Sequence, residues 1–82
     1  MDVMEDKKIK IRLNNIDTVK KFANLASTFK SDIDVIADRA VIDGKSILGL
    51  FSLDLTQVMY VRIVTDDINE RKKFECKMEE FK

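Results

Sequence analysis

Hydrophobic and basic residues alternate strictly over residues 8–13. The apolar positions are Ile9, Ile11 and Leu13, and the basic positions are Lys8, Lys10 and Arg12. A period of two is typical of a strand that buries one face and exposes the other. The segment therefore predicts a strand with a basic outer face.

A helical pattern follows over residues 16–29, where apolar residues recur at steps of three and four. These residues are Ile16, Val19, Phe22, Ala23, Ala26 and Phe29. Asn14 and Asn15 precede the pattern, and Asn is a favoured residue at a helix N-cap. We therefore expect an amphipathic helix over residues 16–29.

Three more strands are predicted. Ile33 and Val35 alternate with aspartates in the first of them, and a short strand with Val41 and Ile42 follows the turn at residues 38–39. In the last strand, residues 59–64, the odd-numbered residues are apolar and are expected to face inward, with Tyr60 and Arg62 outward.

A last helix is predicted after Asp67, which is an acidic cap with Glu70 three residues further on. Its expected apolar side comprises Ile68, Phe74, Met78 and Phe81. Together with a short helix after Ser46, the element order is βαββαβα. Half-buried strands and one-sided helices predict an α+β fold, an open-faced two-layer sandwich with three helices on one face of a four-stranded antiparallel sheet. A chain of 82 residues, 45% of them apolar, is expected to form a single domain over residues 1–82.

The short helix over residues 46–53 carries apolar residues in two directions when it is wound at about 100° per residue. One group contains Gly49, Leu50 and Leu53 beside Ser46, and the other contains Ile47, Leu48 and Phe51. A single sheet cannot bury both groups. We expect the first group to pack inward and the second, called here the apolar cluster, to form an exposed partner surface. The alternative is a short helix that is buried all round.

Charge and composition exclude several functions. Lys plus Arg and Asp plus Glu number 15 each, so we expect no direct nucleic-acid or membrane binding. The acidic start of the chain does not look like a signal peptide, and no apolar stretch reaches the roughly 20 residues of a membrane span, which together predict a cytoplasmic protein. Cys76 is the single cysteine, which excludes an internal disulfide and a thiolate metal cluster. The chain has no His, which excludes imidazole catalysis and His-ligated metal. We expect no cofactor, no metal site and no enzymatic activity.

The segment Lys45-Ser46-Ile47-Leu48-Gly49-Leu50-Phe51-Ser52-Leu53, together with residues 25–33, resembles HPr, the histidine-containing phosphocarrier of the bacterial sugar phosphotransferase system. The similarity extends from Lys8 to the last helix. The family's open-faced βαββαβα sandwich agrees with the predicted architecture. HPr begins its first helix with a motif of the Gly-Leu-His-Ala-Arg-Pro type, whose His accepts phosphoryl from enzyme I.

The resemblance ends at this motif. Asn15 stands where the family has its phosphorylated His, and Asp17 stands where the family has its Arg. The amide nitrogen of Asn is not nucleophilic, and Asp17 would place a negative charge beside an incoming phosphate. The sequence therefore predicts that this chain does not relay phosphoryl through that position.

The regulatory half of the family pattern is kept at Ser46. As a helix N-cap, Ser46 has a structural role, while a phosphoryl group there would meet first-turn N–H groups with Lys45 adjacent. In HPr of low-GC Gram-positive bacteria the matching Ser is phosphorylated by HPr kinase/phosphorylase, and the product is a corepressor for catabolite control protein A. The paralogue catabolite-repression HPr (Crh) lacks the His and works only in this branch, although it retains the Arg that Asp17 replaces.

The resemblance therefore implies a regulatory interaction module that is switched at Ser46 and docks proteins through the apolar cluster, Ile47, Leu48 and Phe51. HPr kinase/phosphorylase and catabolite control protein A are the implied partners. Two alternatives stay open. One is a phosphocarrier with an acceptor other than His, such as an acyl phosphate at Asp17, and the other is a degenerate HPr-like domain in which Ser46 is only a cap.

Overall fold

The computed structural model describes residues 8–82 and has the predicted order of elements. The strands are β1 (Ile9–Ile11), β2 (Asp32–Ala37), β3 (Ala40–Asp43) and β4 (Met59–Val64). The helices are α1 (Ile16–Ala26), α2 (Ile47–Phe51) and α3 (Ile68–Met78), and the 3₁₀ helix η1 (Glu79–Phe81) follows α3. The acidic N-terminal segment and the start of the chain lie outside the described residues.

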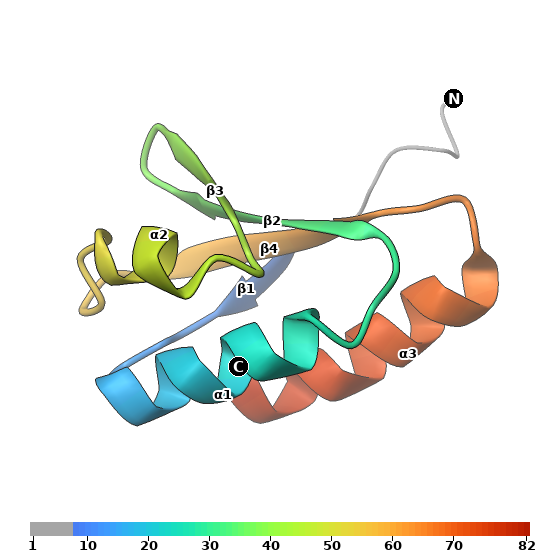
Figure 1. The fold of residues 1–82 in the computed structure, drawn as a ribbon, viewed down its shortest axis with the longest axis horizontal. Helices are drawn as coiled ribbons and strands as arrows, with labels where there is room; N and C mark the ends of the chain where they lie inside the picture. The colour runs from blue at the N-terminus through green and yellow to red at the C-terminus, as the bar shows by residue number, and fades with distance from the viewer. Residues whose placement is uncertain (1–7) are drawn as a thin grey trace.

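The four strands form one antiparallel sheet in the order β1-β4-β2-β3. α1 and α3 run in opposite directions along one side of the sheet, and α2 lies near the start of α1 (Figure 1). This confirms the predicted α+β sandwich with one open sheet face. β1 and β3 are the two edge strands, and β2 and β4 lie between them.

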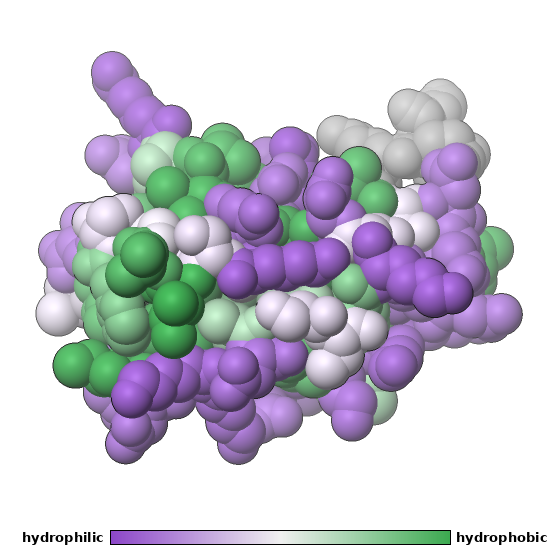
Figure 2. Space-filling view, viewed as in Figure 1, coloured by the Kyte–Doolittle hydropathy of each residue, from purple (hydrophilic) through white to green (hydrophobic). Residues whose placement is uncertain are grey.

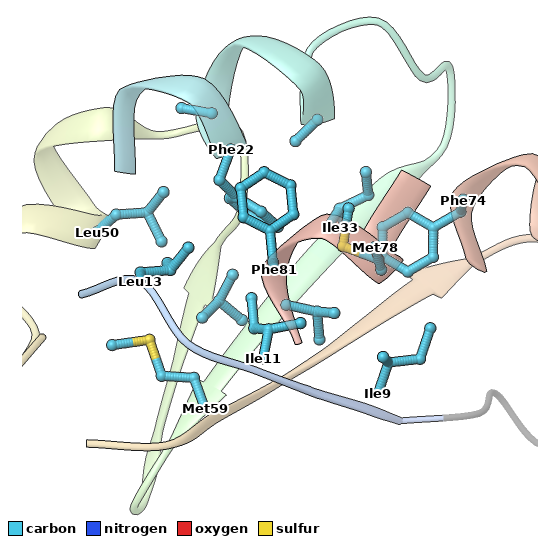
Figure 3. Close-up of a cluster of buried hydrophobic side chains, with 14 of the residues drawn as sticks. Ile9, Ile11, Leu13, Phe22, Ile33, Leu50, Met59, Phe74, Met78 and Phe81 are labelled. Atoms are coloured by element: carbon cyan, nitrogen blue, oxygen red, sulfur yellow. The ribbon is translucent and has the colours of Figure 1, made fainter. Parts of the chain in front are cut away.

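Alternation along the strands divides the sheet into a buried face and an open face. Met59, Val61 and Ile63 of β4 are buried, while Tyr60 is exposed and Arg62 is half-buried. These orientations confirm the pattern predicted for the strand. The inward residues meet aromatic and aliphatic side chains from both long helices, and Figure 3 shows Phe22, Phe74, Met78 and Phe81 gathered over Ile11 and Ile33.

Two edge-to-face phenylalanine pairs connect α1 and its following turn to the C-terminal helices. The Phe22 and Phe81 ring centroids lie 5.5 Å apart at an interplanar angle of 83°. The centroids of Phe29 and Phe74 lie 5.6 Å apart, again at 83°. Such geometry brings the positive edge of one ring to the negative face of the other and adds to the energy of burial.

Three predicted elements were too long. The short helix expected over residues 46–53 covers only Ile47–Phe51, with Ser46 and Ser52 as its caps. The first helix ends at Ala26 and not at residue 29, because the N–H groups of Thr28 and Phe29 bond to carbonyls three residues back and no longer continue the i→i−4 pattern. Phe29 is nevertheless buried beyond the helix end. The first strand covers Ile9–Ile11 and not residues 8–13, because the Arg12 N–H turns away from β4 and donates to the Phe81 carbonyl at 2.8 Å.

The prediction that Ile16 and Ile68 face the core was wrong, since both are exposed. Each is the first residue of its helix. A helical side chain leans over the turn that precedes it, and at the first position there is no such turn to lie on. The other apolar residues predicted for these helices are buried as expected.

Glu70 connects the start of α3 to the turn between α1 and β2. Its carboxylate accepts hydrogen bonds from the Lys30 N–H at 2.9 Å and from the Ser31 hydroxyl. The Ser31 hydroxyl is the larger cause, and with the Lys30 N–H it lowers the pKa of Glu70 below 4.5. A lowered pKa means that the folded state favours the ionised carboxylate.

Replacing Glu70 by Gln should therefore lower the free energy of unfolding near neutral pH. The stabilisation by Glu70 is fully present above pH 4.5 and is lost as the pH falls through its lowered pKa. Denaturant titrations of wild type and Glu70→Gln should differ near pH 7 and converge at an acidic pH below the lowered pKa of Glu70. An equal difference at both pH values would mean that the charge of Glu70 is not what stabilises this connection.

Candidate functional site

Asn15 occupies the N-cap of α1 with an extended backbone. Its Oδ1 accepts hydrogen bonds from the Thr18 N–H at 2.9 Å and from the Thr18 hydroxyl at 3.0 Å. The side chain thus satisfies a first-turn donor of the helix, which is the structural role that the sequence predicted for an Asn here. Asn15 is exposed, so its position is open to a partner.

Asp17 lies in the first turn of α1 and is also exposed. A carboxylate in a first turn interacts favourably with the positive end of the helix dipole. Among residues 8–82, Asp17 forms no ion pair with Lys or Arg. No neighbouring cationic side chain in the described residues therefore offsets the negative charge of Asp17. This is the charge that the sequence predicts will repel an incoming phosphate.

Ser46 is the N-cap of α2, and its Oγ accepts a hydrogen bond from the Gly49 N–H at 3.2 Å. The loop before it is held by the Gly44 N–H, which donates to the Ile33 carbonyl at 2.7 Å. A Cβ on Gly44 would lie 2.8 Å from Ile33 Cγ2, so this approach requires glycine. The Ser46 side chain is partly exposed, and its oxygen lies at the start of the short helix.

The Lys45 side chain is held by a main-chain group, whereas the sequence predicts that its charge faces a phosphoryl group on Ser46. Its Nζ donates to the Phe29 carbonyl at 2.8 Å, so the ammonium group satisfies an acceptor in the turn after α1. Adjacency in sequence led to the expectation that Lys45 faces a phosphoryl group on Ser46, but the ammonium is held by a main-chain group. The sequence pattern gave no indication of this contact, because Phe29 and Lys45 are brought together only by the tertiary fold.

α2 separates its apolar residues largely as predicted. Leu50 is fully buried, and Gly49 allows close packing, since a Cβ there would lie 2.8 Å from Ile42 Cγ2. Leu48 is 80% exposed and Phe51 is 38% exposed, whereas Ile47 is half-buried and packs against the core. The apolar cluster is therefore led by Leu48 and Phe51, and Ile47 forms its base. A group of hydrophobic side chains over α2 is visible at the left of Figure 2.

The predicted site residues fall into two groups on neighbouring helices. Asn15 and Asp17 lie at the start of α1, and Ser46 and the apolar cluster lie on α2, which packs against α1. The arrangement presents a polar helix start, a hydroxyl and an apolar surface without a deep cavity. Within residues 8–82 no cluster of acidic residues and cysteine could hold a metal ion, and no helix is long and apolar enough to cross a membrane.

A surface hollow lies elsewhere, between β1 and the end of α3. Its lining mixes four cations, two carboxylates and two isoleucines: Lys8, Lys10, Arg12, Lys82, Glu75, Glu79, Ile9 and Ile11. None of the predicted site residues lines it. The exposed Cys76 lies on α3 and is not part of the lining either.

Comparison with known proteins assigns the family. Residues 6–80 match the family described as the PTS HPr component phosphorylation site, so the chain belongs to the HPr family of the phosphotransferase system. HPr-family proteins are phosphocarriers rather than catalytic enzymes. None of the curated proteins matches this chain.

Two solved structures have the same fold. HPr-C-His from Thermoanaerobacter tengcongensis is 30% identical, with a TM-score of 0.70 over 89% of this chain and 91% of that one. Crh from Bacillus subtilis is 26% identical, with a TM-score of 0.58 over 90% of this chain and 87% of that one. That Crh structure is described as an intertwined dimer with a swapped domain.

The different burial of Leu48 and Leu50 gives a direct test of the helix orientation. Leu50→Ala should lower the free energy of unfolding by roughly 2–5 kcal/mol, because it empties a fully buried position. Leu48→Ala should change it by at most about 0.5 kcal/mol, because the side chain is mostly in solvent. Denaturant unfolding of the two variants measures the contrast, and a large loss at Leu48 would mean that α2 is buried on both sides.

Proposed function

We propose that this HPr-family chain is a regulatory protein-interaction module that does not relay phosphoryl groups through His. The observation that carries the proposal is the absence of His from the entire sequence of a protein in a His-phosphocarrier family. No other side chain supplies a ring nitrogen to form a phosphohistidine. The position that the family uses for His is assigned to Asn15.

Two features support the loss of relay at Asn15. The Oδ1 of Asn15 caps α1, and an amide has no nucleophilic nitrogen to attack a phosphoryl donor. Asp17 adds an exposed negative charge in the same turn. A dianionic phosphoryl group would therefore approach a carboxylate at the place where the family has a guanidinium.

Ser46 is the proposed site of regulatory phosphorylation. Its Oγ is partly exposed at the start of α2, beside the apolar cluster. A phosphoryl group of about −1.5 to −2 charge would stay close to the first-turn N–H groups, which are favourable to anions. The modification would place this charge next to Leu48 and Phe51, and would change which proteins can dock there.

The proposed partners follow from the family. Phosphotransferase-system proteins are the general class, and HPr kinase/phosphorylase and catabolite control protein A are the specific partners that the resemblance implies. The apolar cluster of Ile47, Leu48 and Phe51 is their proposed contact. We place this function in the cytoplasm, where these partners act.

Incubation with phosphoenolpyruvate and enzyme I should leave the intact mass unchanged, because there is no imidazole to accept the phosphoryl group. An acyl phosphate on Asp17 would appear as an adduct that is labile to both acid and alkali, and it would support the alternative of a non-His carrier. Asn15→His should regain little transfer, and Asn15→His with Asp17→Arg should regain more. Equal transfer by the two variants would show that the charge of Asp17 does not matter.

Incubation with HPr kinase and ATP should add one phosphoryl group at Ser46, located by peptide mass mapping. The Ser46→Ala variant should gain none. Because the new charge replaces the hydroxyl cap at the start of α2, the unfolding temperature should hold or rise slightly.

Two outcomes would contradict this switch. Phosphorylation at Ser27, Ser31 or Ser52 in place of Ser46 would assign the site elsewhere. A fall of several degrees in the unfolding midpoint of the modified protein would show that Ser46 is needed as an unmodified cap. Either result would leave the degenerate HPr-like domain as the better description.

A further inference from the structure

No helix among residues 8–82 covers the open face of the sheet, and strand register fixes which side chains share this face. Lys10 pairs with Tyr60, Tyr60 with Ile36, and Ile36 with Val41. These four side chains form one row across all four strands, since residues in register lie on the same face. In a second row Arg62 pairs with Asp34, and Asp34 pairs with Asp43.

The first row is mainly apolar. Val41 is 58% exposed and Tyr60 is 43% exposed, with the half-buried Ile36 between them. Val64 adds a further exposed apolar side chain on β4. A contiguous apolar row on an uncovered sheet face is the usual core of an interface.

Charge is divided across the same face. The β1 side carries Lys10 on the strand and Lys8 and Arg12 at its ends, while the β2–β3 side carries Asp32, Asp34 and Asp43. The alternation over residues 8–13 predicted this basic outer face. Arg62 and Asp34 form an ion pair at 3.1 Å in the middle of the sheet.

The outer charges on the two sides are only partly offset within the described chain. Glu75 and Glu79 border the same hollow as Lys8, and the Asp43 carboxylate accepts the Lys45 N–H at 2.9 Å. Among residues 8–82, neither Lys8 nor Asp43 forms an ion pair. Asp34 and Asp43 lie directly opposite each other, and like charges opposed across strands are unfavourable. A partner that places cations over β3 and carboxylates over β1 would remove both imbalances.

We propose that this partner is a second copy of the chain, bound open face to open face. A two-fold axis parallel to the strands and midway between β4 and β2 places β1 of each copy over β3 of the other. The same operation keeps each row in register, so it places Tyr60 over Ile36 and Arg62 over Asp34 of the second copy. In the Arg62 row it also places Lys8, the residue next to Ile9 in β1, over Asp43 of the second copy. The face is thus complementary to itself both in its apolar row and in its charges, as an isologous interface requires.

This pairing differs from joining the sheets at their edges. Two β1 strands paired edge to edge would align Lys8, Lys10 and Arg12 of one copy with the same cations of the other. Like-charged edge residues oppose that contact. Face-to-face packing at the usual separation of about 10 Å brings opposite charges together instead.

Sedimentation velocity of the full chain over a concentration series tests the proposal. We expect a monomer–dimer equilibrium that is fully reversible on dilution and weakens as salt is raised, because its charges are exposed. Lys8→Glu and Asp43→Lys, each alone, should weaken dimerisation at least about tenfold, since each sets like charges against each other twice in a two-fold dimer. Lys20→Glu on the helical side is the matched control and should have no such effect.

Mixing the two single variants gives the decisive result. A mixed dimer sets Glu at position 8 against Lys at position 43 in one half and keeps the wild-type pair in the other, so the mixture should dimerise when neither variant does so alone. Tyr60→Glu tests the apolar row separately and should also favour the monomer, whereas Leu48→Glu on α2 should not. Circular dichroism and thermal unfolding verify that each variant is folded.

A chain that remains monomeric at about 1 mM would overturn the proposal, since a Kd above this range is too weak to define an interface. A dimer that resists dilution and is unaffected by the changes at Lys8, Asp43 and Tyr60 would also overturn it, and would point to exchange of a segment between copies. Failure of the mixed variants to dimerise would exclude the two-fold arrangement even if each single variant is monomeric.

Discussion

The contacts between α1 and the C-terminal helices hold the helical layer against the sheet. Phe22 meets Phe81 and Phe29 meets Phe74, each edge to face, and the Phe81 carbonyl also accepts the Arg12 N–H at the end of β1. The end of the chain is thereby connected both to the first helix and to the first strand. The position of α1, and with it the position of Asn15, depends on these buried rings. These rings are part of the apolar layer that packs the helices against the buried face of the sheet.

Most of the fold was predictable, because its strands obey a period of two and its helices bury one side. β4 was predicted with its correct bounds and orientation, and both Asp67 and Ser46 are the caps expected of them. The errors lie where a tertiary contact overrides a local pattern. α1 ends three residues early, in a turn with i→i−3 bonds at Thr28 and Phe29, although the apolar repeat continues to Phe29. No local pattern predicts that β1 is shortened by the hydrogen bond from the Arg12 N–H to the Phe81 carbonyl.

The candidate site was predictable in its residues but less so in its geometry. Helical winding separated Leu50 from Leu48 and Phe51, and the structure has the same separation. Helical winding did not predict that Ile47 packs against the core, nor that the Lys45 ammonium donates to the Phe29 carbonyl. Both depend on how α2 sits on the rest of the fold, which no pattern within residues 46–53 contains. The chemical conclusions drawn from absent residue types, above all His, do not depend on geometry.

The order of the strands has a consequence for synthesis of the chain. β1 pairs with β4, so Lys10 finds its partner Tyr60 about 50 residues later in the sequence. α1 and the β2–β3 hairpin depend on nearer contacts and can form while the ribosome is still adding residues. The central strand β4 comes after all of these, and the sheet cannot close until it has left the ribosome. Until β4 and α3 have been made, the nascent protein therefore carries an uncovered apolar β1 and α1.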